Sequence, residues 1–125
     1  MKRILLALGF WFSISISAFA GDADVPHTTD AINKGRALFI TYCTACHGNN
    51  GKSQVDAVSD ATDLTEPALY RNGNTNAAMH KSIKEGAGSG MPPWGAVLKN
   101  ETEIGYLRAF IHSLWPEAQR PALVK

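Results

Sequence analysis

The chain has 125 residues, which is enough for one small domain, and its 12 basic and 11 acidic side chains leave a formal net charge of only +1. No basic patch points to nucleic acid, and no run of like charge points to a disordered tail. We therefore expect a single folded domain with no nucleic-acid partner.

The first 20 residues have the pattern of a secretory signal peptide. Two basic residues precede an almost wholly apolar run from Ile4 to Phe12, and a small-x-small cleavage pattern ends at Ala20. An uncleaved membrane anchor is the alternative, but the apolar run is short for a span and serines dilute the residues after it. We expect cleavage after Ala20, export to the periplasm, no stable membrane insertion, and a mature domain over residues 21–125 with its core at about 29–115.

The first predicted helix covers residues 31 to about 42. The stretch Thr28–Asp30 supplies side chains that can cap its first turn. Ile32 and Phe39 recur at near-helical spacing, and Gly35 falls on the same face. A glycine inside a helix costs about 1 kcal/mol relative to alanine, so we expect another helix to approach closely at this position.

Both cysteines lie in the stretch Cys43-Thr44-Ala45-Cys46-His47, directly after this helix. Two thiols on one helical turn can reach two adjacent vinyl groups on one edge of a haem, and the following imidazole can bind the iron. This is the attachment motif of c-type haem. We expect one covalent haem c on Cys43 and Cys46, with His47 as the proximal iron ligand. A large apolar cofactor would also supply core that so small a domain lacks.

Two other interpretations of the cysteines remain open on the residues alone. An exported chain with two cysteines ordinarily forms one disulfide, and Cys43 and Cys46 can oxidise to one another. A thioredoxin-like redox site uses the same spacing, but it needs a preceding strand and a βαβ setting, and the sequence shows neither. Neither interpretation gives a role to His47 or to the residues downstream.

The middle of the chain is predicted as a break, a short turn of helix and a longer helix. Residues 48–51 consist of Gly and Asn, which break the helix of the haem motif. Pro67–Arg71 can form one helical turn. A cap at Asn74 or Thr75 then starts a helix that continues to about Glu85.

A proline-stiffened loop follows that helix. Pro92 and Pro93 come directly after Met91, hold the backbone extended and remove two amide donors. Such a loop presents one side chain in a fixed position. We therefore single out Met91 as a candidate iron ligand.

The last predicted helix begins with a capping-box-like pair, Asn100 and Glu103. Its apolar residues recur on one face, and Pro116 stops it. These apolar residues are Ile104, Leu107, Phe110, Ile111 and Leu114. Residues 117–125 are predicted as a short tail. Because no segment carries a strand signal of any strength, we predict an all-α fold.

Several side chains compete for the second axial position on the iron. Met91 is favoured by its rigid loop and by a chain long enough to reach the opposite haem face. Met79 and His80 lie within a predicted helix, where a methionine more often fills the core and a lone histidine is usually solvated or hydrogen-bonded. His27 and His112 have less to recommend them. A thioether opposite His47 would close the coordination sphere, which favours electron transfer over catalysis.

With these residues in view, the chain resembles a class I cytochrome c from about Asn33 to Leu114. The matching pieces are Gly35 and Phe39, Cys43-x-x-Cys46-His47-Gly48, Gly90-Met91-Pro92, and Phe110-Ile111. The resemblance implies that the first and last helices cross near right angles at the glycine and aromatics. It also implies His47 and Met91 as axial ligands. The family often has a proline ahead of Leu64 whose carbonyl holds the histidine. This chain has none, so the sequence leaves that acceptor open.

A narrower resemblance covers Tyr42–Gly51, Glu85–Ala87 and Met91–Trp94. These stretches are similar to small periplasmic cytochromes that accompany quinoprotein alcohol dehydrogenases, and to haem domains of terminal-oxidase subunits. The resemblance implies a single-electron carrier that takes electrons from a dehydrogenase and passes them to an oxidase or another cytochrome. Tyr70 and Trp94 either edge the haem or fill the core, and Arg71 either pairs with a haem propionate or is solvated.

The rival hypothesis is a haem enzyme or a gas-binding sensor. It requires an open sixth site on the iron, so Met91 would be only a packing residue. A closed site makes the protein an electron carrier and not an enzyme, and this is the expectation that the sequence favours.

Overall fold

A computed structural model describes residues 25–53 and 60–125, and within these ranges the regular elements are helical, apart from one isolated bridge between Ala87 and Met91. The elements are α1 (Thr29–Tyr42), α2 (Thr44–His47), the 3-10 turn η1 (Pro67–Leu69), α3 (Asn76–Glu85), α4 (Glu101–Leu114) and the 3-10 turn η2 (Glu117–Gln119). This confirms the all-α prediction. The predicted signal peptide lies outside the described residues. No helix in the described ranges combines the length and the apolar character that a membrane crossing requires.

Helix α1 starts where its capping stretch was predicted. The Thr28 hydroxyl accepts a hydrogen bond from the Ala31 amide at 3.1 Å, so Thr28 is the cap among the three candidates. At the other end, Cys43 still donates to the Phe39 carbonyl at 2.9 Å, and α2 follows almost without interruption. The haem motif therefore lies on a direct extension of α1, and this extension ends at Gly48.

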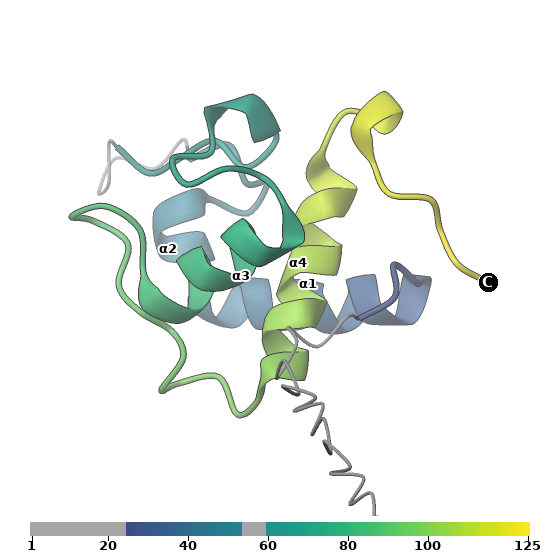
Figure 1. The fold of residues 1–125 in the computed structure, drawn as a ribbon, viewed down its shortest axis with the longest axis horizontal. Helices are drawn as coiled ribbons and strands as arrows, with labels where there is room; N and C mark the ends of the chain where they lie inside the picture. Colours follow the sequence, from purple (N-terminus) through teal and green to yellow (C-terminus); the bar gives the residue numbers. More distant parts are fainter. Residues whose placement is uncertain (1–24, 54–59) are drawn as a thin grey trace, which may run out of the picture.

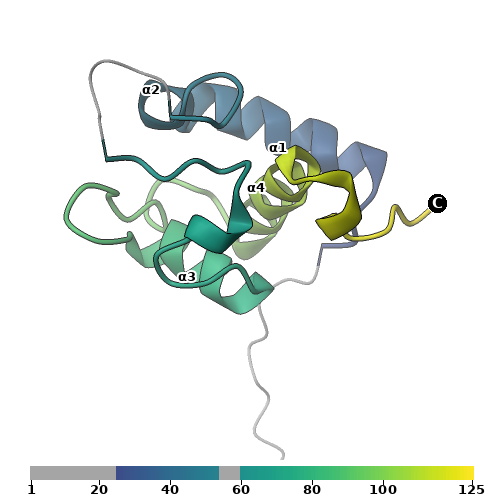
Figure 2. The same ribbon diagram turned by 90° about the horizontal axis from the view of Figure 1, so that it is seen from above.

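Helices α1 and α4 cross in contact with one another, as both ribbon views show (Figures 1 and 2). The contact is centred on Gly35, where an added β-carbon would lie 1.9 Å from the Tyr106 carbonyl oxygen and 2.8 Å from Phe110 Cβ. The Phe39 and Phe110 rings pack beside this point with centroids 5.0 Å apart. The predicted reason for a helical glycine, close approach of another helix, is confirmed.

The start of α4 differs in one detail from the predicted capping box. The Asn100 side chain accepts from the Glu103 amide at 3.0 Å, as expected. The Glu103 carboxylate instead accepts from the Lys99 amide, at 2.7 Å, one residue earlier than a capping box requires. Both bonds still satisfy free amides, so the chain is fixed as it enters the helix.

The core lies between α1, α3 and α4. Helix α4 contributes most of it, and buried positions extend beyond its apolar face to Arg108 and His112. Helix α3, capped by Thr75 as predicted, adds Met79 and Ile83. The other members of the buried apolar cluster are Phe39, Leu98, Ile104, Leu107, Phe110, Ile111 and Trp115. Much of this cluster faces a crevice, because residues from each of the three helices line it.

The C-terminal residues pack more closely than a loose tail. The Val124 amide donates to the His27 carbonyl at 2.9 Å, so the tail returns to the segment that precedes α1. Beneath this contact, the His112 ring lies 4.5 Å from the Trp115 ring and 6.0 Å from the His27 ring, centroid to centroid. Burial, with smaller effects from His27 and Arg108, lowers the pKa of His112 to about 4.

This histidine predicts acid sensitivity. The pKa of His112 falls from 6.5 to about 4 on folding, so the unfolded chain binds the proton more tightly. The contribution of the neutral His112 ring to the free energy of unfolding is fully present above about pH 6.5. About 3 kcal/mol of it is lost as the pH falls to about 4. Replacing His112 by phenylalanine keeps an aromatic ring beside Trp115 but removes the titration. The free energy of unfolding of the holoprotein, measured with urea from pH 7 to pH 4, should fall less steeply for His112→Phe than for wild type. An equal fall in both proteins would contradict the prediction.

Candidate haem site

An apolar crevice opens among α1, α3, α4 and the loop after α3. Its inner part holds about 730 Å³ of space, a value that includes open solvent at the mouth. A second space of about 720 Å³ adjoins it toward the haem motif. The residues that line both spaces are Tyr42, Cys43, His47, Thr62, Ala87, Met91 and Trp94. The two spaces together are called the crevice below.

The two cysteines lie at one edge of the crevice. Cys43 lines both spaces and Cys46 the outer one, and both are half-buried thiols that are not joined to one another. Burial, reinforced by the neighbouring Cys46, raises the pKa of the Cys43 thiol to about 12. A thioredoxin-like site needs a thiolate of lowered pKa, so the environment of Cys43 argues against that interpretation.

His47 has a fixed ring orientation. Its Nδ1 lies 3.1 Å from the Thr62 carbonyl oxygen. Because a carbonyl oxygen only accepts, Nδ1 carries the hydrogen, and Nε2 keeps its lone pair for a metal in the crevice. Burial lowers the pKa of His47, against a smaller opposing effect of the Thr62 hydrogen bond. The acceptor that the sequence left open is therefore Thr62.

Met91 reaches the crevice from a closed turn. The Ala87 amide donates to the Met91 carbonyl at 3.1 Å, and the Met91 amide donates to the Ala87 carbonyl at 3.3 Å. The loop after the turn is attached to α3, since the Trp94 amide donates to the Ile83 carbonyl at 3.0 Å. Backbone hydrogen bonds thus fix this loop in addition to the two prolines. The half-buried Met91 side chain lines both parts of the crevice.

The other candidate ligands lie elsewhere or serve the core. Met79 also lines the inner crevice, but it is 3% exposed and belongs to the buried apolar cluster. His80 lines neither part of the crevice and contacts Glu101. His27 and His112 lie together near the C-terminal tail and line neither part of the crevice. Among the methionines and histidines predicted as candidates, the crevice thus brings together His47, Met79 and Met91.

Aromatic side chains form much of the crevice wall. Tyr70 and Trp94 both line it, and Trp94 packs on Tyr42 with ring centroids 5.8 Å apart. The Tyr70 hydroxyl donates to the Leu64 carbonyl at 2.8 Å and accepts from Trp115 Nε1 at 2.9 Å. The Trp115 contact was not predicted, because a tryptophan just after a helix carries no sequence signal for a partner 45 residues away.

Arg71 lies at the mouth of the crevice, where it lines the outer space. Its guanidinium passes over Gly88, where an added β-carbon would lie 3.1 Å from Nε. Asp60 lines the same space. Arg71 is exposed and borders the outer space, so the structure leaves open both of its predicted roles.

The crevice therefore has the donor types that a covalent haem requires. Its inner wall is almost wholly apolar, two thiols lie at one edge, and an imidazole with a free nitrogen and a thioether reach it from different segments. The site residues left out of the prediction contribute either a backbone atom or an apolar wall. The Thr62 carbonyl carries no side-chain signature, and wall residues such as Leu98 and Leu107 look like ordinary core in the sequence.

Comparison with known proteins gives a family match and several relatives. The family model described as cytochrome c oxidase, cbb3-type, subunit III matches residues 30–111. The subunit FixP of the cbb3-type cytochrome c oxidase of Azorhizobium caulinodans is 35% identical over 89 residues, which are 71% of this chain and 29% of that protein. The subunit CcoP of the oxidase of Cereibacter sphaeroides is 30% identical over 81 residues, 65% of this chain and 27% of that protein. The chain thus spans less than a third of the length of these curated relatives.

Solved structures agree with the fold. Cytochrome cL of Methylophaga aminisulfidivorans is 26% identical with a TM-score of 0.60, over 70% of this chain and 55% of that one. Cytochrome cL of Hyphomicrobium denitrificans is 26% identical with a TM-score of 0.57, over 69% of this chain and 49% of that one. Cytochrome c6 of Phaeodactylum tricornutum, at 23% identity and a TM-score of 0.52 over 64% and 88%, supports the fold alone. The predicted class I cytochrome c fold is confirmed.

The family match extends from the first turn of α1 to near the end of α4 and includes the haem motif and the crevice walls. Covering residues 30–111 of 125, it shows that the chain belongs to the family of cbb3-type cytochrome c oxidase subunit III, a family of electron-transfer cytochrome c domains that carry covalently bound haem c.

Proposed function

We propose that the protein is a periplasmic single-electron carrier with one haem c, held by thioethers at Cys43 and Cys46 and ligated axially by His47 and Met91. The observation that carries this proposal is the convergence of the four side chains on one apolar crevice, with the His47 ring oriented by Thr62. A bound haem supplies a one-electron couple at its iron. The protein binds it, limits its contact with water and sets its potential.

Each part of the crevice has a distinct effect on electron transfer. The Thr62 carbonyl makes His47 a stronger donor by sharing its Nδ1 hydrogen. The turn that closes at Ala87 and Met91 holds the thioether in place without a large rearrangement on oxidation or reduction. The apolar wall lowers the local dielectric and disfavours the more highly charged oxidised form, which raises the potential.

The proposed export and domain limits rest on the sequence pattern. We propose that residues 1–20 are a cleaved signal peptide and that residues 21–125 are the mature domain. Covalent attachment through a c-type motif fits an exported protein. Mass spectrometry of the purified holoprotein should give the mass of a chain starting at Gly21 plus one haem.

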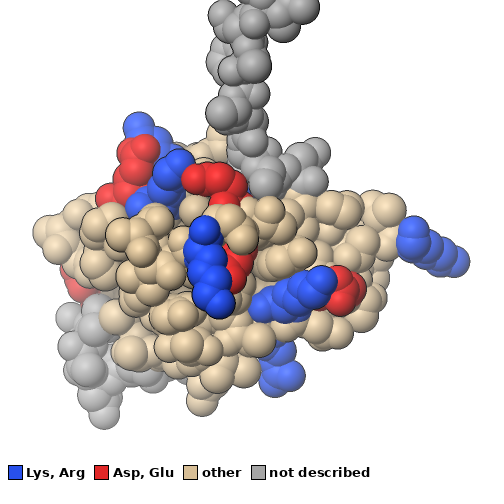
Figure 3. Space-filling view, turned by 90° about the horizontal axis from the view of Figure 1, so that it is seen from below, with Lys and Arg blue, Asp and Glu red and all other residues tan. Residues whose placement is uncertain are grey.

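We propose an oxidase or another cytochrome as the electron acceptor and a periplasmic dehydrogenase as the donor. The narrower resemblance implies the quinoprotein alcohol dehydrogenases as the class of donor. The relatives' names support the acceptor, because they are subunits of cbb3-type oxidases. On the face shown in Figure 3, lysines and arginines alternate with acidic side chains and uncharged surface. Cleavage after Ala20 removes Lys2 and Arg3, so the mature domain has 10 basic and 11 acidic side chains and a formal net charge of −1. Long-range steering is then weak, and docking depends on short-range contacts and a few charges.

The test separates this proposal from the haem enzyme or gas sensor with an open sixth site. Oxidised wild-type protein should show a sulfur-to-iron charge-transfer band near the red end of the visible spectrum, and the reduced protein should bind carbon monoxide poorly. Met91→Ala should lose the band and bind carbon monoxide readily. Met79→Leu is the matched control, since Met79 lines the same crevice and should leave both properties unchanged. A wild-type protein that is high-spin would overturn the closed site.

A further inference from the structure

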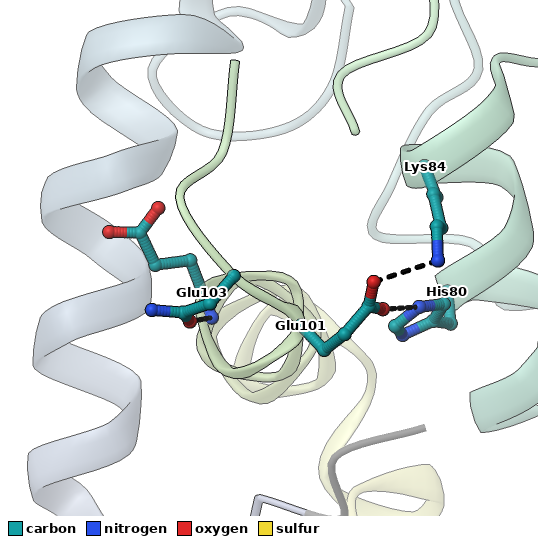
Figure 4. A network of polar contacts seen from close by, with 5 residues as sticks. His80, Lys84, Glu101 and Glu103 are labelled. Atoms are coloured by element: carbon teal, nitrogen blue, oxygen red, sulfur yellow. Dashed lines mark hydrogen bonds and ion pairs between the residues drawn. The ribbon is translucent and has the colours of Figure 1, made fainter. Parts of the chain in front are cut away.

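A polar cluster outside the crevice joins α3 to the start of α4. Glu101, the first residue of α4, accepts hydrogen bonds through both carboxylate oxygens, from His80 Nε2 at 2.5 Å and from Lys84 Nζ at 2.7 Å (Figure 4). His80 and Lys84 are one helical turn apart on α3, so they present their donors to the same point. One carboxylate therefore holds two successive turns of α3.

The contact is more than a solvated surface pair. His80 is only 9% exposed, and Lys84 and Glu101 each keep about half of their side-chain surface exposed. The hydrogen bond between Lys84 and Glu101 raises the pKa of the lysine and lowers the pKa of the carboxyl group. Because both oxygens have partners, rotation of the carboxylate breaks at least one charge-assisted bond.

The turn of α3 that Glu101 holds also holds the loop of Met91. The Lys84 carbonyl accepts from the Gly95 amide at 3.0 Å, and the neighbouring Ile83 carbonyl accepts from Trp94. The stem of Lys84 packs on the same loop, where a β-carbon at Gly95 would lie 2.9 Å from Lys84 Cγ. Because Lys84 contacts the loop through both its backbone and its side chain, a shift of Lys84 moves the loop.

On its other side the loop is closed onto itself by the Ala87–Met91 pair. It therefore has two attachments, the end of α3 before Ala87 and the α3 carbonyls that hold Trp94 and Gly95. Both attachments belong to the last turn of α3. The position of Met91 in the crevice consequently depends on how firmly that turn is held against α4.

We propose that Glu101 is a positioning residue for Met91: by holding His80 and Lys84 it keeps the last turn of α3, and with it the methionine loop, closed over the crevice. The inference rests on the proposed ligation of the iron by Met91. It assigns to a residue outside the crevice an effect on how readily Met91 leaves the iron.

The experiment uses imidazole as a competitor for the Met91 position in the oxidised holoprotein. Glu101→Gln is nearly isosteric but removes the charge, and Lys84→Met keeps the apolar stem that packs on Gly95. Each variant should bind imidazole about fivefold more tightly than wild type, because a weaker closed state is easier to open. The double variant should gain less than the product of the two effects, since both act on one contact.

A second background distinguishes positioning from general loosening. In Met91→Ala protein there is no thioether to displace, so Glu101→Gln should leave imidazole affinity unchanged there. An equal gain in both backgrounds would show that the substitution only loosens the crevice, and would overturn the inference. Glu85→Gln is the matched control, because it makes the same charge change at the end of α3, where Glu85 lies 3.9 Å from Lys81 on the same helix.

Failure of this inference can be told from failure of the proposed function. If wild-type protein lacks the sulfur-to-iron band, the ligation itself is wrong. If wild type has the band and Glu101→Gln and Lys84→Met both bind imidazole as wild type does, only the role of Glu101 is overturned. Should Glu101→Gln yield no holoprotein, Lys84→Met carries the same comparison in both backgrounds.

Discussion

Replacing Gly35 by alanine is expected to destabilise the folded protein by about 3 kcal/mol or more. The new β-carbon would lie 1.9 Å from the Tyr106 carbonyl oxygen and 2.6 Å from its carbon, both backbone atoms that cannot rotate away. Helices α1 and α4 must then separate. Their separation loosens the Phe39–Phe110 contact and one wall of the crevice, since Phe39 lines it.

Thermal unfolding of the holoprotein measures the effect, and a loss of this size lowers the Tm by about 15 °C in a domain of this length. The sign of the stability change is decisive, because alanine in place of glycine inside an unobstructed helix stabilises the folded protein by about 1 kcal/mol. Asn33→Ala, at an exposed position of α1, is the control and should stay within about 0.5 kcal/mol of wild type. Stabilisation by Gly35→Ala would show that the helices do not meet at this residue.

Replacing both Cys43 and Cys46 by serine is expected to abolish covalent haem and to leave a chain without a cooperative fold. The crevice takes up space among α1, α3 and α4, and core residues such as Phe39, Met79 and Leu107 line it. Without a haem these side chains lose their packing partner or face water. Empty apolar space in a core is destabilising, so a chain that cannot fill the crevice with haem is less stable than the holoprotein.

Haem staining of a denaturing gel and circular dichroism of the exported protein measure the two effects. Each single variant keeps one thiol and should retain a reduced amount of bound haem. Ala45→Ser is the matched control, because it adds a hydroxyl at an exposed position inside the motif and should stain as wild type does. Haem staining of the double variant would contradict the proposed covalent attachment. A double variant that lacks haem but unfolds cooperatively would contradict the proposed dependence of the fold on haem.

The helices were predictable because their limits are local. Side-chain caps at Thr28, Thr75 and Asn100 each satisfy an amide within three residues, so the sequence neighbourhood contains the whole interaction. The predicted ends of α1 and α4 agree with the structure for the same reason. The tail was predicted less well, because its contact with His27 joins two ends of the chain.

The site was predictable where side-chain identity carries the chemistry. A thiol, an imidazole or a thioether at a given spacing has few alternative uses, so Cys43, Cys46, His47 and Met91 stand out in the sequence. Their roles remain predictions that the experiments above test. The orientation of His47 was not predictable, because its acceptor is a backbone carbonyl, and every residue has one.

The sequence by itself determined the helical class, the helix limits and the four candidate haem-binding side chains, because each depends on local patterns or on rare chemical groups. Only the tertiary structure decided that Thr62 orients His47 and that Glu101 joins α3 to α4. These contacts join residues far apart along the chain. Common groups form them, and common groups acquire a role only when the fold brings them together.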